Sequence, residues 1–106
     1  MLESHCIISG SPQELVFHIR TESGEVINPN ECENICWILY ECIVGKKNRV
    51  VLKKDVLRVD DECVLVELEP SDTRGLDGTY VQEMSFDLDG DFDVSSGAIN
   101  VLLPLQ

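Results

Sequence analysis

Positively charged residues are scarce in this chain. Only 8 Lys and Arg stand against 20 Asp and Glu among 106 residues, which gives a formal net charge of −12. Proteins hold nucleic-acid backbones with clustered Lys and Arg, so this balance argues against a nucleic-acid partner. One related alternative stays open, an acidic inhibitor that imitates the charge of a nucleic acid. The densest basic cluster is most simply the solvated tip of a hairpin, and it comprises Lys46, Lys47, Arg49, Lys53 and Lys54.

A long apolar run is also missing. No stretch approaches the roughly 20 apolar residues of a transmembrane helix, so we expect no membrane partner. The opening residues MLESHCIISG contain no basic region followed by an apolar stretch, so no secretory signal is predicted. We therefore expect a cytoplasmic product. A hydrophobic content of 43% in a chain of this length predicts one ordered domain over residues 1–106.

The cysteines follow no disulfide or metal pattern. Their number is odd and no secretion signal is predicted, which favours reduced thiols. The spacing between the three central cysteines is not a zinc spacing, and neither His5 nor His18 lies in a metal-binding pattern. We expect neither a metal nor a cofactor. The five residues concerned are Cys6, Cys32, Cys36, Cys42 and Cys63.

Catalytic motifs are absent as well. The sequence has no Gly-x-Ser-x-Gly elbow, no glycine-rich phosphate loop and no paired histidine motif. His18 falls on the outward side of a candidate strand, where we expect a solvated or rim histidine. The acidic groups at residues 60–62 and 67–69 are interpreted as turn and strand-surface charges, because so small a domain offers little cleft. We predict that the protein is not an enzyme.

What the chain does have is a series of short alternating strands. Residues 14–21, 62–69 and 79–88 each place apolar side chains at every second position, as half-buried strands do. Turn signals separate these runs, and no helix of useful length is indicated. The pattern predicts an all-β, immunoglobulin-like antiparallel sandwich of about seven to eight strands. The predicted core comprises Leu15, Phe17, Ile19, Trp37, Val64, Val66, Tyr80, Met84 and Phe86.

Three details of the strands carry specific expectations. Gln82 falls on the buried side of its strand and must find a hydrogen-bond partner. Residues 45–48 are expected to form a hairpin turn, and Asp89 with Gly90 another. Gly97 is expected to mark a β-bulge.

The segment at residues 34–44 is apolar on both of its faces. A sandwich strand needs only one buried face, so the second face requires an explanation. One interpretation is that Cys36, Ile38 and Tyr40 lie beneath a loop or the N-terminal segment. The other is that they form a subunit contact, because exposed apolar patches often mark interfaces.

Residues 65–80 form the most informative stretch, an alternating strand that turns a polar corner into the next strand. In immunoglobulin-like sandwiches a Tyr at this place hydrogen-bonds back to the preceding loop. We expect Tyr80 to bond to residues 72–76 and the Thr73 hydroxyl to help close the corner. Loss of the hydroxyl in Tyr80→Phe is expected to cost roughly 1–2 kcal/mol. Leu76 and Gly78 complete this predicted structural set, together with Trp37.

Alternating carboxylates at Asp87, Asp89, Asp91 and Asp93 raise a second binding hypothesis. Calcium takes six to eight oxygen ligands, so such a run is able to wrap a cation. An EF-hand loop, however, needs Gly at its sixth position and Glu at its twelfth, and this run has neither. A solvated polar hairpin is the simpler interpretation, and a calcium-dependent binding or adhesion module is the alternative.

The order of these signals resembles the small immunoglobulin-like domains of bacteriophage and prophage tail regions, in particular the N-terminal domain of phage upper-baseplate proteins. The resemblance covers nearly the whole chain, at residues 7–10, 15–24, 35–43, 64–68, 72–73, 76–80, 89–90 and 97–101. The corner reads Leu-Asp-Gly-Thr-Tyr here, one residue shorter than the family's Leu-x-x-Gly-x-Tyr.

This resemblance implies a non-enzymatic virion, tail or baseplate component that works through protein–protein contacts. The implied partners are other tail proteins or further copies of the chain, as a homo-oligomer. The implied location is the bacterial cytoplasm during assembly and the virion afterwards. Family members usually continue into a further domain or fibre, whereas this sequence ends at residue 106, which favours a stand-alone structural or adaptor subunit.

Overall fold

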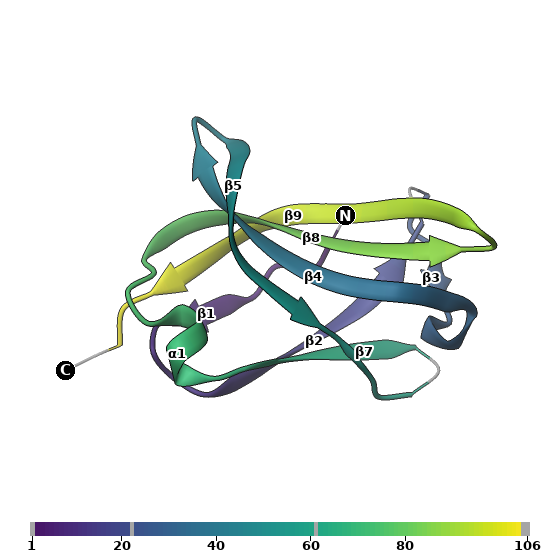
Figure 1. The fold of residues 1–106 in the computed structure, drawn as a ribbon, viewed down its shortest axis with the longest axis horizontal. Helices are drawn as coiled ribbons and strands as arrows, with labels where there is room; N and C mark the ends of the chain where they lie inside the picture. The colour runs from purple at the N-terminus through teal and green to yellow at the C-terminus, as the bar shows by residue number, and fades with distance from the viewer. Residues whose placement is uncertain (1, 22, 61, 105–106) are drawn as a thin grey trace.

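The protein is a sandwich of two β-sheets. The computed structural model describes residues 2–21, 23–60 and 62–104, so Glu22 and Asp61 of two predicted turns lie outside the described residues. The strands are β1 (Cys6–Ile8), β2 (Gln13–Arg20), β3 (Val26–Ile27), β4 (Cys32–Ile43), β5 (Lys46–Asp55), β6 (Leu57–Arg58), β7 (Cys63–Leu68), β8 (Gly78–Leu88) and β9 (Asp91–Leu102). Figure 1 labels all of them except the two-residue strand β6. Two short helical segments join them, η1 (Pro29–Glu31) and α1 (Pro70–Thr73). Among the described residues, no helix is long and apolar enough to cross a membrane.

The strand order is that of an immunoglobulin-like sandwich. One sheet has the order β1-β9-β8-β4-β5 and the other the order β3-β2-β7-β6. Strands β9, β8, β4 and β5 thus correspond to G, F, C and C′, while β2, β7 and β6 correspond to B, E and D. The predicted fold class is confirmed. The prediction that all strands pair antiparallel is wrong for one pair, because β1 runs parallel to β9.

The core lies between the two sheets and follows the predicted alternation, except that Tyr80 of the predicted core is only half-buried and packs against its edge. Phe17, Trp37 and Phe86 are its largest side chains and are at most 1% exposed. The rings of Phe17 and Trp37 stack with their centroids 6.4 Å apart. Further buried residues come from every long strand except β5, and they include Leu15, Ile19, Leu39, Val64, Val66, Met84, Ile99 and Val101.

Gln82 is fully buried, and its side chain has the hydrogen-bond partners that were predicted for it. Its Oε1 accepts a hydrogen bond from Trp37 Nε1 at 3.0 Å, and its Nε2 donates to the Glu3 carbonyl at 2.7 Å. The residue stands two positions after Tyr80, where antibody domains place the second cysteine of their inter-sheet disulfide. Gln82 thus makes polar contacts beside the core tryptophan at this position, and all five cysteines are free.

The N-terminal segment closes one open side of the sandwich. Leu2 is 3% exposed, and its N–H donates to the Ser96 carbonyl of β9 at 3.0 Å. Glu3 reaches β2, because one of its carboxylate oxygens accepts the His18 N–H at 2.7 Å. The segment is thereby fixed to both sheets.

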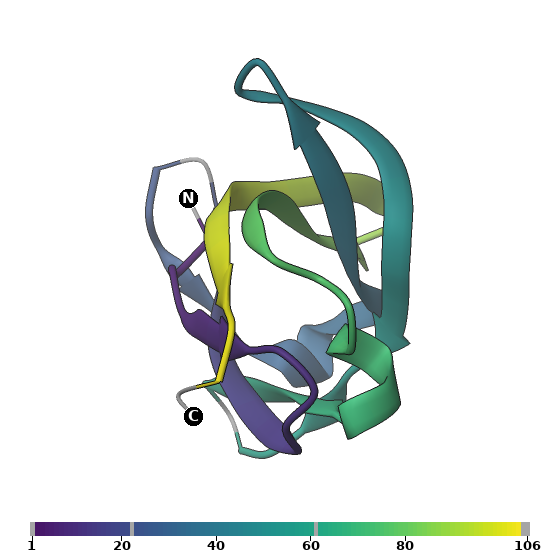
Figure 2. The same cartoon turned by 90° about the vertical axis from the view of Figure 1, so that its left-hand side faces the viewer.

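The corner between β7 and β8 contains α1, and its hydrogen bonds differ from the prediction. Tyr80 Oη accepts the N–H of Asp77 at 3.1 Å, one residue beyond the predicted range. The Thr73 hydroxyl does not close the corner itself but accepts the Gly10 N–H at 2.8 Å, across to the turn after β1. Figure 2 shows α1 beside that turn at this end of the sandwich. Gly78 has a φ of 100°, which explains why glycine suits this position.

The irregular backbone positions lie elsewhere than predicted. Gly97 pairs in unbroken register with Gln82, so the expected bulge there is wrong. Register shifts occur instead along β4, between Glu33 and Cys36 and again between Leu39 and Cys42. The β4–β5 hairpin turns at Val44 and Gly45, since Ile43 pairs with Lys46, rather than at residues 45–48. The predicted turn at Asp89 and Gly90 is confirmed, because Leu88 pairs with Asp91.

Candidate functional site on the outer face of the five-stranded sheet

The doubly apolar segment places Cys36, Ile38 and Tyr40 on the outer face of the five-stranded sheet. They alternate along β4 with Trp37 and Leu39, which face the core and are fully buried. Cys36 is 9% exposed, whereas Ile38 and Tyr40 are half-buried. The N-terminal segment lies against β2 and β9 and does not explain their burial.

Strand register extends these residues into three rows across the sheet. One row is Ala98, Val81, Tyr40 and Val50; the next is Ser96, Glu83, Ile38 and Lys53; the third is Val94, Ser85, Cys36 and Asp55. Side chains that lie opposite one another on neighbouring strands share a face and touch. We call this set the outer-face rows. They form an apolar strip at one end of the set and a mixed polar and apolar area at the other.

Charged groups border the apolar part of the outer-face rows. Lys47 Nζ lies 4.9 Å from the centroid of the Tyr40 ring and 2.7 Å from Glu83 Oε2. Burial, and then the nearby Glu83 carboxylate, raise the pKa of the Tyr40 hydroxyl, so that it stays protonated. Tyrosine is enriched at protein interfaces, and charged groups belong to their polar rim rather than to their buried centre.

Exposed apolar side chains lie within the rows and beyond them. Val50, at the end of the first row, is 52% exposed, and Phe92, which lies opposite Asp87 at the far end of the sheet, is 71% exposed. The β4–β5 hairpin projects beyond the sandwich in Figure 1, and it leaves Ile43 50% and Val44 94% exposed. Ile43 has the same alternation as Trp37 and Leu39 along β4, but it lies past the register shifts of that strand and is exposed rather than buried in the core.

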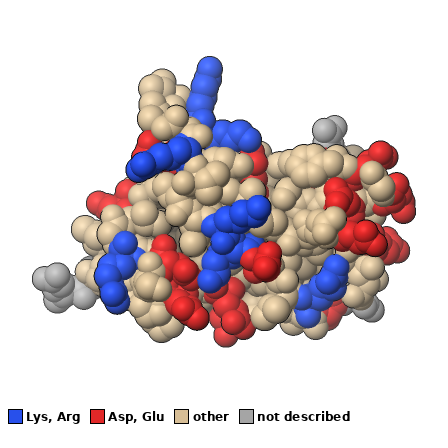
Figure 3. Space-filling model, in the orientation of Figure 1, with Lys and Arg blue, Asp and Glu red and all other residues tan. Residues whose placement is uncertain are grey.

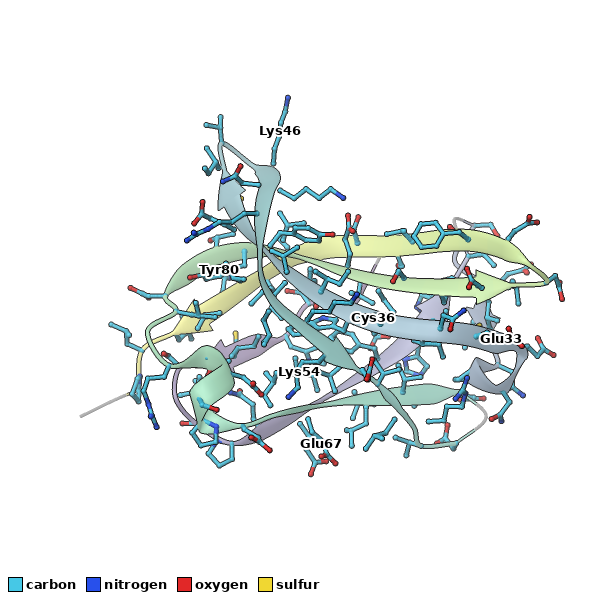
Figure 4. The ribbon with its side chains drawn as sticks, viewed as in Figure 1. Glu33, Cys36, Lys46, Lys54, Glu67 and Tyr80 are labelled. Carbon is cyan, nitrogen blue, oxygen red and sulfur yellow. The ribbon has the colours of Figure 1, made fainter. Side chains whose placement is uncertain are left out.

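The hairpin tip combines strain with positive charge. Val44 has a φ of 51°, a left-handed conformation that a β-branched residue adopts only at a cost. Arg49 pairs with Glu41 at 3.3 Å, while Lys46 points away from the molecule at the top of Figure 4. Lys46 is therefore solvated, as predicted for the basic residues of the hairpin tip. Lys54, labelled in the same figure, instead binds Asp72 of α1 at 2.9 Å.

The four aspartates of the calcium hypothesis do not converge. Asp87 faces outward and accepts a hydrogen bond from Asn34 Nδ2 at 2.8 Å, whereas Asp93 lies opposite the inward-facing Phe86. Asp91 shares the side of Asp93, and Asp89 occupies the turn. Within the described part of the chain, no three His, Cys, Asp or Glu side chains are placed to hold one metal ion. The geometry therefore gives the calcium hypothesis no support.

The acidic residues do not form a single stripe on the face seen in Figure 3. Carboxylates gather at the β8–β9 turn and along the lower edge, and Lys and Arg side chains stand between them and over the hairpin. A protein that imitates a nucleic acid needs a continuous row of negative charge. This face does not present one.

One constellation has no counterpart in the sequence-based predictions. His18 of β2 and Cys63 of β7 lie directly opposite each other, with His18 Nε2 3.5 Å from the Cys63 sulfur. His18 Nδ1 lies 2.8 Å from a carboxylate oxygen of Glu3. The expected solvated or rim histidine is thus a half-buried one, and both of its ring nitrogens have partners. The outward parity of both residues is visible in the sequence, but the register that aligns them is not.

Comparisons with known proteins assign this chain to no family. No protein-family model matches the sequence, and no curated protein matches it. Among solved structures, the chain is similar to one in the crystal structure of the titin M10–obscurin-like 1 Ig complex, at 16% identity and a TM-score of 0.44. The match covers 99% of this chain and 91% of that one. The immunoglobulin-like assignment stands on the strand order and the tyrosine corner described above.

Proposed function

We propose that the protein is a non-enzymatic interaction module that binds another protein through the outer-face rows. The observation that carries this proposal is the row of Ala98, Val81, Tyr40 and Val50, which runs across four strands on the outside of a sheet. Pairing within the row stabilises the sheet itself, but it leaves part of the row's apolar surface in water. A partner that covers the row removes its apolar surface from water.

The surrounding residues suit a partner of mixed polarity. The ion pair of Lys47 with Glu83 lies beside Tyr40 and leaves Lys47 half exposed, so it is able to bind carboxylates or carbonyls at the rim. The strained Val44 tip and the exposed Phe92 stand at either end of the face. Rigid aromatic and aliphatic anchors within a polar rim are the usual anatomy of a specific protein interface.

We further propose that this module is a structural or assembly component of a phage or prophage tail or baseplate. Support comes from the order of turn and core motifs, which resembles that family from the first strand to the last. On this proposal the protein assembles in the bacterial cytoplasm, and its partners are other tail proteins. The role belongs to the outer-face rows and not to any catalytic group.

The test begins with the DNA that flanks the gene. Neighbouring genes that resemble tail, baseplate or lysis genes are expected, and their products are then co-expressed with this chain. A complex that survives size-exclusion chromatography with one of those products supports the proposal. Neighbours devoted to secretion, surface adhesion or metabolism would leave the fold intact and remove the tail role.

A further inference from the structure

Cys63 and His18 form a cross-strand pair on the outer face of the four-stranded sheet. The alternation of β2 turns Leu15, Phe17 and Ile19 inward and His18 outward, and β7 turns Cys63 outward in the same way. The two residues occupy matching positions in the ladder, and the sulfur lies 3.5 Å from His18 Nε2. Both side chains are half-buried and open to solvent on one side.

Glu3 fixes the orientation of this histidine. One carboxylate oxygen of Glu3 lies 2.8 Å from His18 Nδ1 and 2.7 Å from the His18 backbone nitrogen. The ring therefore donates its proton from Nδ1, and the lone pair of Nε2 faces the sulfur. A carboxylate behind the imidazole is the arrangement that orients histidine ligands in metal sites.

The separation of the two atoms fits a tetrahedral metal. A zinc ion about 2.3 Å from a thiolate sulfur and about 2.0–2.1 Å from an imidazole nitrogen sets those atoms about 3.6 Å apart. The observed distance is 3.5 Å. In the metal-free protein the same distance accommodates a hydrogen bond from the thiol to the ring.

The local charge favours a cation over a reactive thiolate. Burial raises the pKa of the Cys63 thiol, and the carboxylates of Asp60, Glu62 and Glu3 raise it further. A nucleophilic cysteine needs the opposite surroundings, with positive charge close to the sulfur. A bound dication both neutralises the thiolate and gains from the carboxylates around it.

We propose that Cys63 and His18 form half of a zinc-type metal site, and that the same pair from a second copy of the chain completes it. Two ligands from each chain give the four-coordinate Cys2His2 set that structural zinc sites use. Within the described residues, one copy supplies no third ligand of the His, Cys, Asp or Glu type. Binding replaces the thiol proton of each Cys63, which passes to solvent, and no oxidation or reduction takes place.

The surface next to the pair suits a two-fold contact. Val16, Leu65 and Leu57 form the neighbouring row across β2, β7 and β6 on the same outer face. Val16 is 43% and Leu57 53% exposed. In a two-fold dimer each copy presents the same patch, so this apolar row packs against its counterpart while the metal lies on the axis. The site is on the sheet opposite the outer-face rows and does not depend on the function proposed for them.

The test uses the reduced, full-length protein with Co2+ as the spectroscopic probe and Zn2+ for assembly. Addition of Co2+ is expected to give a thiolate-to-metal absorption band and the visible bands of a tetrahedral site. Zn2+ is expected to convert monomer to dimer in sedimentation velocity, at one metal per two chains. Cys63→Ser and His18→Gln should lose both signals, while Cys6→Ser, which alters an exposed cysteine of β1, should keep them.

Glu3→Gln tests whether Glu3 orients His18 without itself binding the metal. It should keep the thiolate band but weaken metal binding by about tenfold or more, the usual effect of removing such a carboxylate. Thermal unfolding of each variant without metal shows whether it is folded. Bands that persist in folded Cys63→Ser, or a metal bound to wild-type monomer without dimer formation, would overturn the proposal.

Discussion

Trp37 Nε1 donates a hydrogen bond to Gln82 Oε1 at 3.0 Å, between two fully buried side chains of β4 and β8. Gln82 also holds the N-terminal segment through the Glu3 carbonyl. One side chain thus satisfies the indole of the core tryptophan and fastens the segment that closes the sandwich. It does this at the position where an antibody domain has a disulfide cysteine.

Gln82→Leu is expected to lower the free energy of unfolding by about 2–3 kcal/mol. The substitution leaves the Trp37 N–H without its acceptor inside the core, and a buried unsatisfied polar group costs about 1–3 kcal/mol. It also releases the Glu3 carbonyl. Urea denaturation measures the change, and Ser96→Ala, at an exposed position of β9, is the control. An unfolding free energy equal to that of wild type would show that the contact does not hold the core together.

Tyr80→Phe is expected to lower the free energy of unfolding by about 0.5–1 kcal/mol, which is less than the roughly 1–2 kcal/mol expected from the corner motif alone. Tyr80 is half-buried, and the Asp77 N–H that it accepts lies at an exposed residue, so water replaces the lost acceptor. Thr73→Val should cost more, because Thr73 is 0% exposed and its hydroxyl accepts the Gly10 N–H. Chemical denaturation of the two variants side by side tests this order, and a larger loss in Tyr80→Phe contradicts it.

Asp72 should contribute to the pH dependence of stability. The N–H of Glu69, and then Lys54, lower the pKa of its carboxyl below the ordinary value of 3.8. A group whose pKa is lower in the folded state stabilises the fold above the unfolded pKa, and this stabilisation is lost as pH falls through the folded pKa. The difference in unfolding free energy between wild type and Asp72→Asn should therefore be largest at neutral pH and shrink below pH 3.8. A difference that is constant with pH would contradict this.

Calcium should not stabilise the protein. Asp87 faces the opposite side from Asp91 and Asp93, so these carboxylates cannot share one ion without rearranging the β8–β9 hairpin. A ligand that binds only the folded state raises the melting temperature, which makes the thermal shift a direct test. We expect no shift in millimolar calcium chloride. A rise in melting temperature that Asp87→Asn abolishes would restore the calcium hypothesis.

Sequence patterns predicted the parts of the fold that depend on local alternation. Leu15, Phe17 and Ile19 in β2 and Met84 and Phe86 in β8 are buried as expected, because a strand turns every second side chain inward. The Asp89-Gly90 turn follows from its two residues alone. These features need no knowledge of which strands pair.

The features that the sequence did not reveal depend on pairing between distant strands. The bulges of β4 begin near Asn34, whose φ of 54° is not signalled by its neighbours. The Val44 turn uses a residue type that avoids such a conformation. His18 and Cys63 are 45 positions apart, and only the β2–β7 register brings them together. The same holds for Thr73 and Gly10, which meet across the end of the sandwich.

The central claim is that the outer-face rows bind a partner protein, and isothermal titration with the product of a flanking tail gene tests it most directly. Tyr40→Asp places a charge within the apolar row, while Val26→Asp places the same charge on β3 of the opposite sheet, at a residue that is 44% exposed. We predict that Tyr40→Asp weakens binding at least tenfold, which corresponds to about 1.4 kcal/mol, and that Val26→Asp leaves it unchanged. Equal affinities for wild type and Tyr40→Asp would contradict the account.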